Sequence, residues 1–126
     1  MDKKQILIVD DERDVLSVLE KGLTSEGYSV ITESCGNNVM SLAKTRQPDL
    51  IILDLELPDM YGGDIARMLE EDPETKHIPV IFLTGMFPNE RGSRVIANHV
   101  LFEKPYDILR LITAIEELLS EKVFCR

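Results

Sequence analysis

The sequence predicts an α/β fold with a five-stranded parallel sheet and helices on both of its faces. Five short apolar segments of strand length recur along the 126 residues, and each is followed by a stretch with the periodicity of an amphipathic helix. Several of these strands are apolar without interruption, as strands buried on both faces are. Right-handed crossovers between such strands place helices on both sides of the sheet. We expect the strand order 2-1-3-4-5.

The predicted elements follow one another in a regular alternation. Continuous apolar runs, or alternating ones, place the strands at 5–9, 28–34, 49–57, 78–85 and 100–105. Helical spacing of apolar residues predicts a first helix that starts at Arg13 and ends at Gly27, and a second that ends before Pro48. The last four helices are placed at 37–47, 64–72, 89–98 and 107–122. Helix 89–98 contains Gly92, which lowers its helix propensity.

Length and charge restrict the function. A chain of 126 residues fits one domain, which we place at 1–126, and no linker or repeat divides it. The net charge of −9 argues against nucleic acid or an anionic membrane as a direct partner, and favours a cationic partner or a metal ion. The apolar run "ILIV" is too short for a signal peptide or a membrane span, so we expect a cytoplasmic protein.

Polar residues with chemical potential follow the predicted strands. Asp10 and Asp11 come after the first strand, the third strand ends on Asp54, the fourth ends on Thr84, and the fifth ends on Lys104. In an open parallel sheet, ligands bind at the carboxyl ends of the strands where the strand order reverses. With the order 2-1-3-4-5, strands one and three are neighbours there, and the three aspartates converge.

Three adjacent carboxylates repel one another, and a bound divalent cation relieves that repulsion. Ligands that are all oxygen select a hard ion, and Mg²⁺ suits a site that keeps waters for a phosphate to replace. Lys104 and Thr84 would then face the oxygens of a phosphoryl group. No cysteine or histidine lies at a strand end, so Asp54 is the best candidate for a nucleophile that forms an acyl phosphate.

The motifs resemble those of a known family. "VDDE", "DLELPDMYGG", "FLTG" and "EKP" occur in this order, and the pattern D-x-x-x-P-x-x-x-G is present as Asp54, Pro58 and Gly62. The chain resembles, over nearly its whole length, the receiver domain of two-component response regulators. The resemblance implies a flavodoxin-like (βα)5 fold and signalling by phosphoryl transfer.

The resemblance also assigns roles to residues. It implies that Asp54 is the phosphoacceptor, that Asp11 and Asp54 bind Mg²⁺ directly together with the backbone carbonyl of Glu56, and that Asp10 acts through water. Thr84 would be the switch hydroxyl, and Lys104 would bind the phosphoryl oxygens. The family commonly has an aromatic residue three positions before this lysine, where this chain has Leu101.

The implied partners are proteins. A sensor histidine kinase or phosphotransfer protein would supply the phosphoryl group, and a downstream protein would bind the phosphorylated form. A homodimer is a further candidate assembly, since receivers often dimerise. The residues after the last predicted helix, "VFCR", leave no room for an output domain, so we expect a stand-alone receiver.

Other interpretations of the same residues remain open. Asp10, Asp11 and Asp14 could cap the first helix, and this role is compatible with metal binding. Thr84 alone would be a turn residue, and Lys104 alone a solvated lysine. A degenerate receiver that acts as a phosphorylation-independent interaction module is the main alternative function. A Mg²⁺-dependent phosphatase is a third, but such enzymes typically have a second aspartate where this chain has Glu56.

Overall fold

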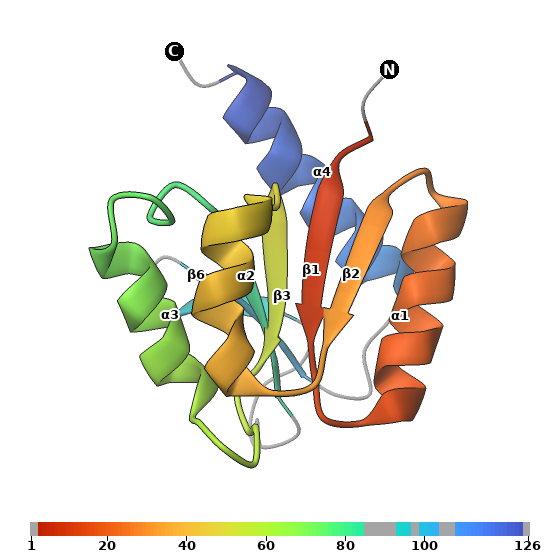
Figure 1. The fold of residues 1–126 in the computed structure, drawn as a ribbon. Helices are drawn as coiled ribbons and strands as arrows, with labels where there is room; N and C mark the ends of the chain where they lie inside the picture. Colours follow the sequence, from red (N-terminus) through yellow and green to blue (C-terminus); the bar gives the residue numbers. More distant parts are fainter. Residues whose placement is uncertain (1–2, 85–92, 97–98, 104–107, 125–126) are drawn as a thin grey trace.

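The computed structural model describes residues 3–84, 93–96, 99–103 and 108–124, and it consists of one sheet with helices packed on both faces (Figure 1). The strands are Gln5–Val9 (β1), Ser29–Glu33 (β2), Leu50–Asp54 (β3), Val80–Thr84 (β4), Ser93–Ile96 (β5) and His99–Glu103 (β6). The helices are Arg13–Ser25 (α1), Val39–Arg46 (α2), Gly62–Glu71 (α3) and Ile108–Phe124 (α4), with a 3-10 turn, Gly36–Asn38 (η1), before α2.

The sheet confirms the predicted fold class. The strand order is β2-β1-β3-β4-β6-β5. The five strands from β2 to β6 in this order all run parallel to one another. The first four strands therefore lie in the predicted order, and β6 takes the place of the predicted fifth strand. None of the helices in the described part of the chain is long and apolar enough to cross a lipid bilayer.

The predicted helix 89–98 is wrong in its described part. Residues Ser93–Ile96 form β5, which pairs antiparallel with β6 at the edge of the sheet. Val95 and Ile96 are β-branched and favour extended backbone, while Gly92 disfavours a helix before them. A segment this short gains more from ladder hydrogen bonds to a neighbouring strand than from a marginal helix. The rest of the predicted helix lies outside the described residues.

The strands divide their side chains between two cores. In β1, Leu7 and Val9 point into one core, and Ile6 and Ile8 point into the other. This alternation repeats in β3 and β4, because successive side chains of a strand point to opposite faces. The first core is closed by side chains of α2 and α3, and the second by side chains of α1 and α4. The central strands are thus buried on both faces, as their continuous apolar sequences predict.

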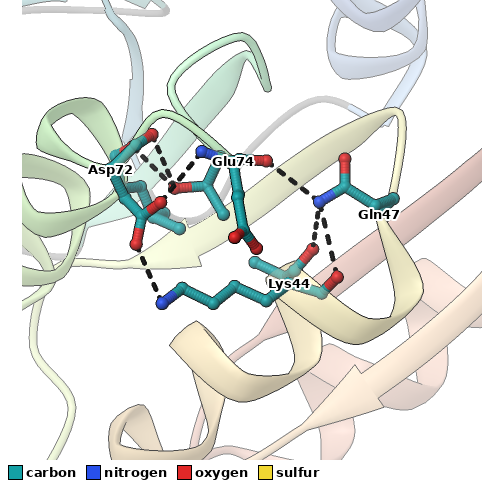
Figure 2. Close-up of polar contacts among 7 residues, drawn as sticks. Lys44, Gln47, Asp72 and Glu74 are labelled. Atoms are coloured by element: carbon teal, nitrogen blue, oxygen red, sulfur yellow. Dashed lines mark hydrogen bonds and ion pairs between the residues drawn. The ribbon is translucent and has the colours of Figure 1, made fainter.

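A polar cluster joins the ends of α2 and α3 (Figure 2). The Lys44 ammonium lies 2.9 Å from the Asp72 carboxylate, and Gln47 Nε2 donates a hydrogen bond of 2.9 Å to the carbonyl of Glu74. Gln47 also donates from Nε2 to the carbonyls of Ala43 and Lys44 in the last turn of α2. Its backbone has a φ of 46°, in the left-handed region that often ends a helix. One side chain therefore both ends α2 and attaches it to the turn after α3.

Two substitutions of Gln47 separate the backbone conformation from the side-chain bonds. Both Gln47→Ala and Gln47→Gly lose the Nε2 donor, but only alanine has a Cβ that is strained at this positive φ. We expect Gln47→Ala to be less stable than Gln47→Gly by about 1 kcal/mol in urea denaturation. Equal stability of the two variants would contradict a left-handed conformation at this position.

The Asp72 carboxylate makes the free energy of unfolding depend on pH. The Glu74 amide and the Lys44 ammonium hold the pKa of Asp72 below its usual value. The stabilisation is therefore complete above the unfolded-state pKa of about 3.9, and is lost as the pH falls through the lower folded-state value. We expect Asp72→Asn to lower the free energy of unfolding at neutral pH, and the difference from the wild type to shrink in acid. A difference that stays constant down to the acid transition would contradict this assignment.

Candidate functional site

The ends of β1 and β3 bring the predicted aspartates together. Val9 and Leu53 are paired residues of these neighbouring strands, so Asp10 and Asp54 follow at the same edge of the sheet. Asp10 is fully buried, Asp54 is 2% exposed, and Asp11 is exposed. One oxygen from each of the three carboxylates lies within 4.8 Å of the others. The convergence that the strand order predicts is present in the structure.

Backbone amides orient the two buried carboxylates. Asp10 Oδ1 accepts a hydrogen bond of 2.9 Å from the amide of Glu12, and Asp54 Oδ1 accepts one of 3.0 Å from the amide of Glu56. The amide of Asp10 in turn donates to the carbonyl of Glu33, at the end of β2. These bonds fix the direction in which each carboxylate points at the edge of the sheet.

The donor set fits a hard divalent cation. Three carboxylate groups this close repel one another, and the cluster offers oxygen atoms alone. Mg²⁺ and Ca²⁺ take oxygen ligands, whereas softer ions prefer nitrogen or sulfur. Of the predicted metal residues, Asp10, Asp11 and Asp54 belong to the cluster. The side chain of Glu56 is exposed and is not a member, which is compatible with a role through its backbone carbonyl.

The loop after Asp54 folds back on itself. Glu56 and Tyr61 form an isolated antiparallel bridge, and the amide of Gly62 donates a hydrogen bond of 2.8 Å to the carbonyl of Leu55. A Cβ atom on Gly62 would overlap the carbonyl oxygen of Asp54 and lie 2.8 Å from Leu55 Cα. The glycine of the sequence pattern is therefore required by the close approach of the loop's end to the backbone of Asp54.

Asp59 is a residue at this end of the sheet that the sequence analysis did not identify. Its carboxylate accepts hydrogen bonds of 3.0 Å from the amide of Gly36 and 2.9 Å from the amide of Asn37, both in η1. These amides, that of Asn37 first, hold the pKa of Asp59 below its usual value. The sequence "LPDM" is typical of a turn, but it gave no signal for partners more than 20 residues away.

The remaining predicted site residues are Thr84 and Lys104. Thr84 is the last residue of β4, and it is paired with Glu103 of β6. The amide of Leu55 donates to the carbonyl of Leu83, so the end of β4 adjoins the backbone that follows Asp54. Lys104 lies outside the described residues. The loops after β1, β2 and β3 all lie at one end of the sheet (Figure 1).

A family comparison agrees with this architecture. A model of the response regulator receiver domain matches residues 6–116. The chain is 30% identical over 120 residues to the polar-differentiation response regulator DivK of Brucella ovis, which covers 94% of this chain and 98% of DivK. It is 40% identical over 91 residues to the response regulator PleD of Caulobacter vibrioides, which covers 72% of this chain but only 20% of PleD.

Solved structures show the same fold. A putative response regulator from Chloroflexus aurantiacus superposes with a TM-score of 0.82 at 25% identity, over 94% of this chain and 99% of that one. A response regulator receiver domain protein from Methanospirillum hungatei superposes with a TM-score of 0.80 at 24% identity, over 95% of this chain and 96% of the other. The match of the family model, the relation to DivK and the aspartates at the strand ends agree, and the chain belongs to the response regulator receiver domain family.

Proposed function

We propose that the chain accepts a phosphoryl group onto Asp54 from a phosphohistidine of a sensor histidine kinase or phosphotransfer protein, in a reaction that requires Mg²⁺. The observation that supports this most strongly is the cluster of Asp10, Asp11 and Asp54, with oxygens within 4.8 Å at the ends of adjacent parallel strands. A phosphorylation-independent interaction module would not need three adjacent carboxylates. The phosphorylated chain would then change its affinity for a downstream protein.

Phosphoryl transfer forms one bond and breaks another. An oxygen of the Asp54 carboxylate forms a bond to phosphorus while the phosphorus–nitrogen bond of the donor breaks, and the donor imidazole takes up a proton. The Glu56 amide, bound to Asp54 Oδ1, orients the carboxylate for this step. The chain catalyses its own gain and loss of phosphate and does not turn over a separate substrate.

Neighbouring residues would stabilise the negative charge that develops during phosphoryl transfer. Asp11, Asp54 and the Glu56 carbonyl would hold Mg²⁺ directly, with Asp10 acting through water. When bound, Mg²⁺ supplies positive charge that offsets the carboxylates and the phosphoryl oxygens. The Lys104 ammonium and the Thr84 hydroxyl would bind phosphoryl oxygens, and the engagement of Thr84 would connect phosphorylation to a change of conformation.

Two large apolar side chains, Val18 on α1 and Leu109 at the start of α4, are exposed. Val18 is 57% exposed and Leu109 is 70% exposed. The two helices meet where Gly22, one turn after Val18, faces Ile108: a Cβ atom at Gly22 would lie 3.5 Å from that side chain. Apolar side chains can pack into the buried centre of an interface with a partner protein. Because α1 begins directly after the acidic cluster, we assign this surface to the phosphodonor protein.

Phosphorylation of Asp54 is tested by intact mass after incubation with Mg²⁺ and acetyl phosphate. We expect the wild type to gain the mass of one phosphoryl group. Asp54→Asn and a wild-type sample with chelator should gain none. Asp64→Asn, in the first turn of α3 and outside the cluster, is the matched control and should gain as much as the wild type.

The result can contradict the proposal in two ways. A phosphoryl gain in Asp54→Asn would assign the acceptor elsewhere. No gain in the wild type, together with no binding of beryllofluoride, would overturn phosphoryl transfer as the function of the chain.

The phosphodonor surface is tested by comparing a protein donor with a small one. The protein donor is a purified histidine kinase that phosphorylates the wild type. We expect Val18→Ala to raise the KM of this reaction roughly 5-fold, equivalent to about 1 kcal/mol of interface energy. The rate with acetyl phosphate should not change, because a small donor does not contact α1. Met68→Ala, a partly exposed apolar residue on α3, is the control. An equal loss with both donors would contradict this surface.

A further inference from the structure

We propose that Asp59 is a positioning residue for the metal site: its carboxylate anchors the loop that follows Asp54 to η1, and so holds the backbone of Glu56 where it can serve as a ligand. The proposal rests on the proposed function, since it concerns the Mg²⁺ site of that function. Asp59 itself does not touch the acidic cluster, and it acts through the loop.

The base of this loop is fixed by the backbone of the sheet. The amide of Leu55 donates to the carbonyl of Leu83 at 2.9 Å, and the amide of Gly62 donates to the carbonyl of Leu55 at 2.8 Å. The bridge between Glu56 and Tyr61 then makes residues 56–61 a closed turn. Asp59 lies within that turn, away from the bonds at its base.

The turn is held to a second loop by the Asp59 side chain. Both carboxylate oxygens are used, because Oδ1 accepts from the amide of Gly36 and Oδ2 accepts from the amide of Asn37. The loops also pack closely. A Cβ atom on Gly36 would lie 2.9 Å from Ile65 Cδ1 and 3.1 Å from Met60 Cβ, so a larger residue there would require these side chains to shift.

The same segment carries the Glu56 backbone. The Glu56 amide donates to Asp54 Oδ1 at one end of the turn, and Asp59 is bound three residues later. Mutation of a partner that orients a metal ligand typically lowers metal affinity or activity by about 10- to 100-fold. The pKa of Asp59 lies below its usual value, so the anchor is charged at neutral pH. Loss of the anchor would let the turn move relative to the cluster and weaken metal binding.

The second loop also contacts the cluster from the other side. The carbonyl of Glu33 accepts from the amide of Asp10 at 3.1 Å, and a Glu33 carboxylate oxygen accepts from the amide of Cys35 at 2.9 Å. The segment from Glu33 to Asn37 is therefore bonded both to Asp10 and to the turn after Asp54. This connection links η1 to the backbone on both sides of the proposed metal site.

The test is the affinity for Mg²⁺, measured by isothermal titration calorimetry on the whole chain at a temperature where each variant is folded. We expect Asp59→Ala to weaken Mg²⁺ binding by roughly 10-fold. Asp59→Asn keeps an oxygen that can accept from one amide, and it should fall between Asp59→Ala and the wild type. It also carries the test if Asp59→Ala does not fold. In acetyl phosphate assays of the Asp59 variants, the Mg²⁺ concentration that gives half of the maximal rate should rise by a larger factor than the factor by which the maximal rate falls.

The matched control is Asp72→Asn. Asp72 is likewise a carboxylate that accepts a hydrogen bond from a backbone amide, that of Glu74. It follows the last residue of α3, whereas Gly62, which lies against the backbone of Asp54, is the first residue of that helix. It should lose stability without losing Mg²⁺ affinity. Mg²⁺ affinity of both Asp59 variants within about twofold of the wild type would overturn the inference alone and leave Asp59 a purely stabilising residue. A wild type that binds no Mg²⁺ would overturn the proposed function, and this inference with it.

Discussion

Burial of β1 and β3 on both faces is the constraint on which the rest of the structure depends. Their apolar side chains alternate between the α2–α3 core and the α1–α4 core, and no face remains for a polar group along their length. A carboxylate can therefore be placed only where these strands end. Because adjacent parallel strands end at the same edge, this constraint also brings Asp10 and Asp54 together.

The proximity of the carboxylates has an electrostatic consequence. Charges buried this deeply are costly unless hydrogen bonds or counter-charges compensate them. The amides of Glu12 and Glu56 supply part of that compensation, and under the proposed function a bound Mg²⁺ would add to it. The electrostatic balance of three carboxylates this close together is sensitive to any change of charge. Addition of a phosphoryl group is such a change, and this connects the proposed chemistry to signalling.

Two loops next to the cluster support each other. A Cβ atom at Gly62 would overlap the backbone of Asp54, and one at Gly36 would crowd the side chains of Ile65 and Met60 between the loops. The Asp59 carboxylate then joins the loops through two amides. A similar arrangement holds the opposite ends of α2 and α3, where Gln47 and the Lys44–Asp72 ion pair join helices that lie side by side (Figure 2).

The sequence by itself determined the fold class, the order of the elements as far as Thr84 and the aspartates of the cluster. Each depends on a local signal: an apolar run of strand length, a helical period, or an acid directly after a strand. Only the tertiary structure decided that Ser93–Ile96 is a strand, because its conformation depends on pairing with β6 and its own propensity is ambiguous. The hydrogen bonds of Asp59 were also hidden, because its partners Gly36 and Asn37 are distant in sequence. Local patterns specify which elements form, whereas contacts between distant segments are settled when those elements pack.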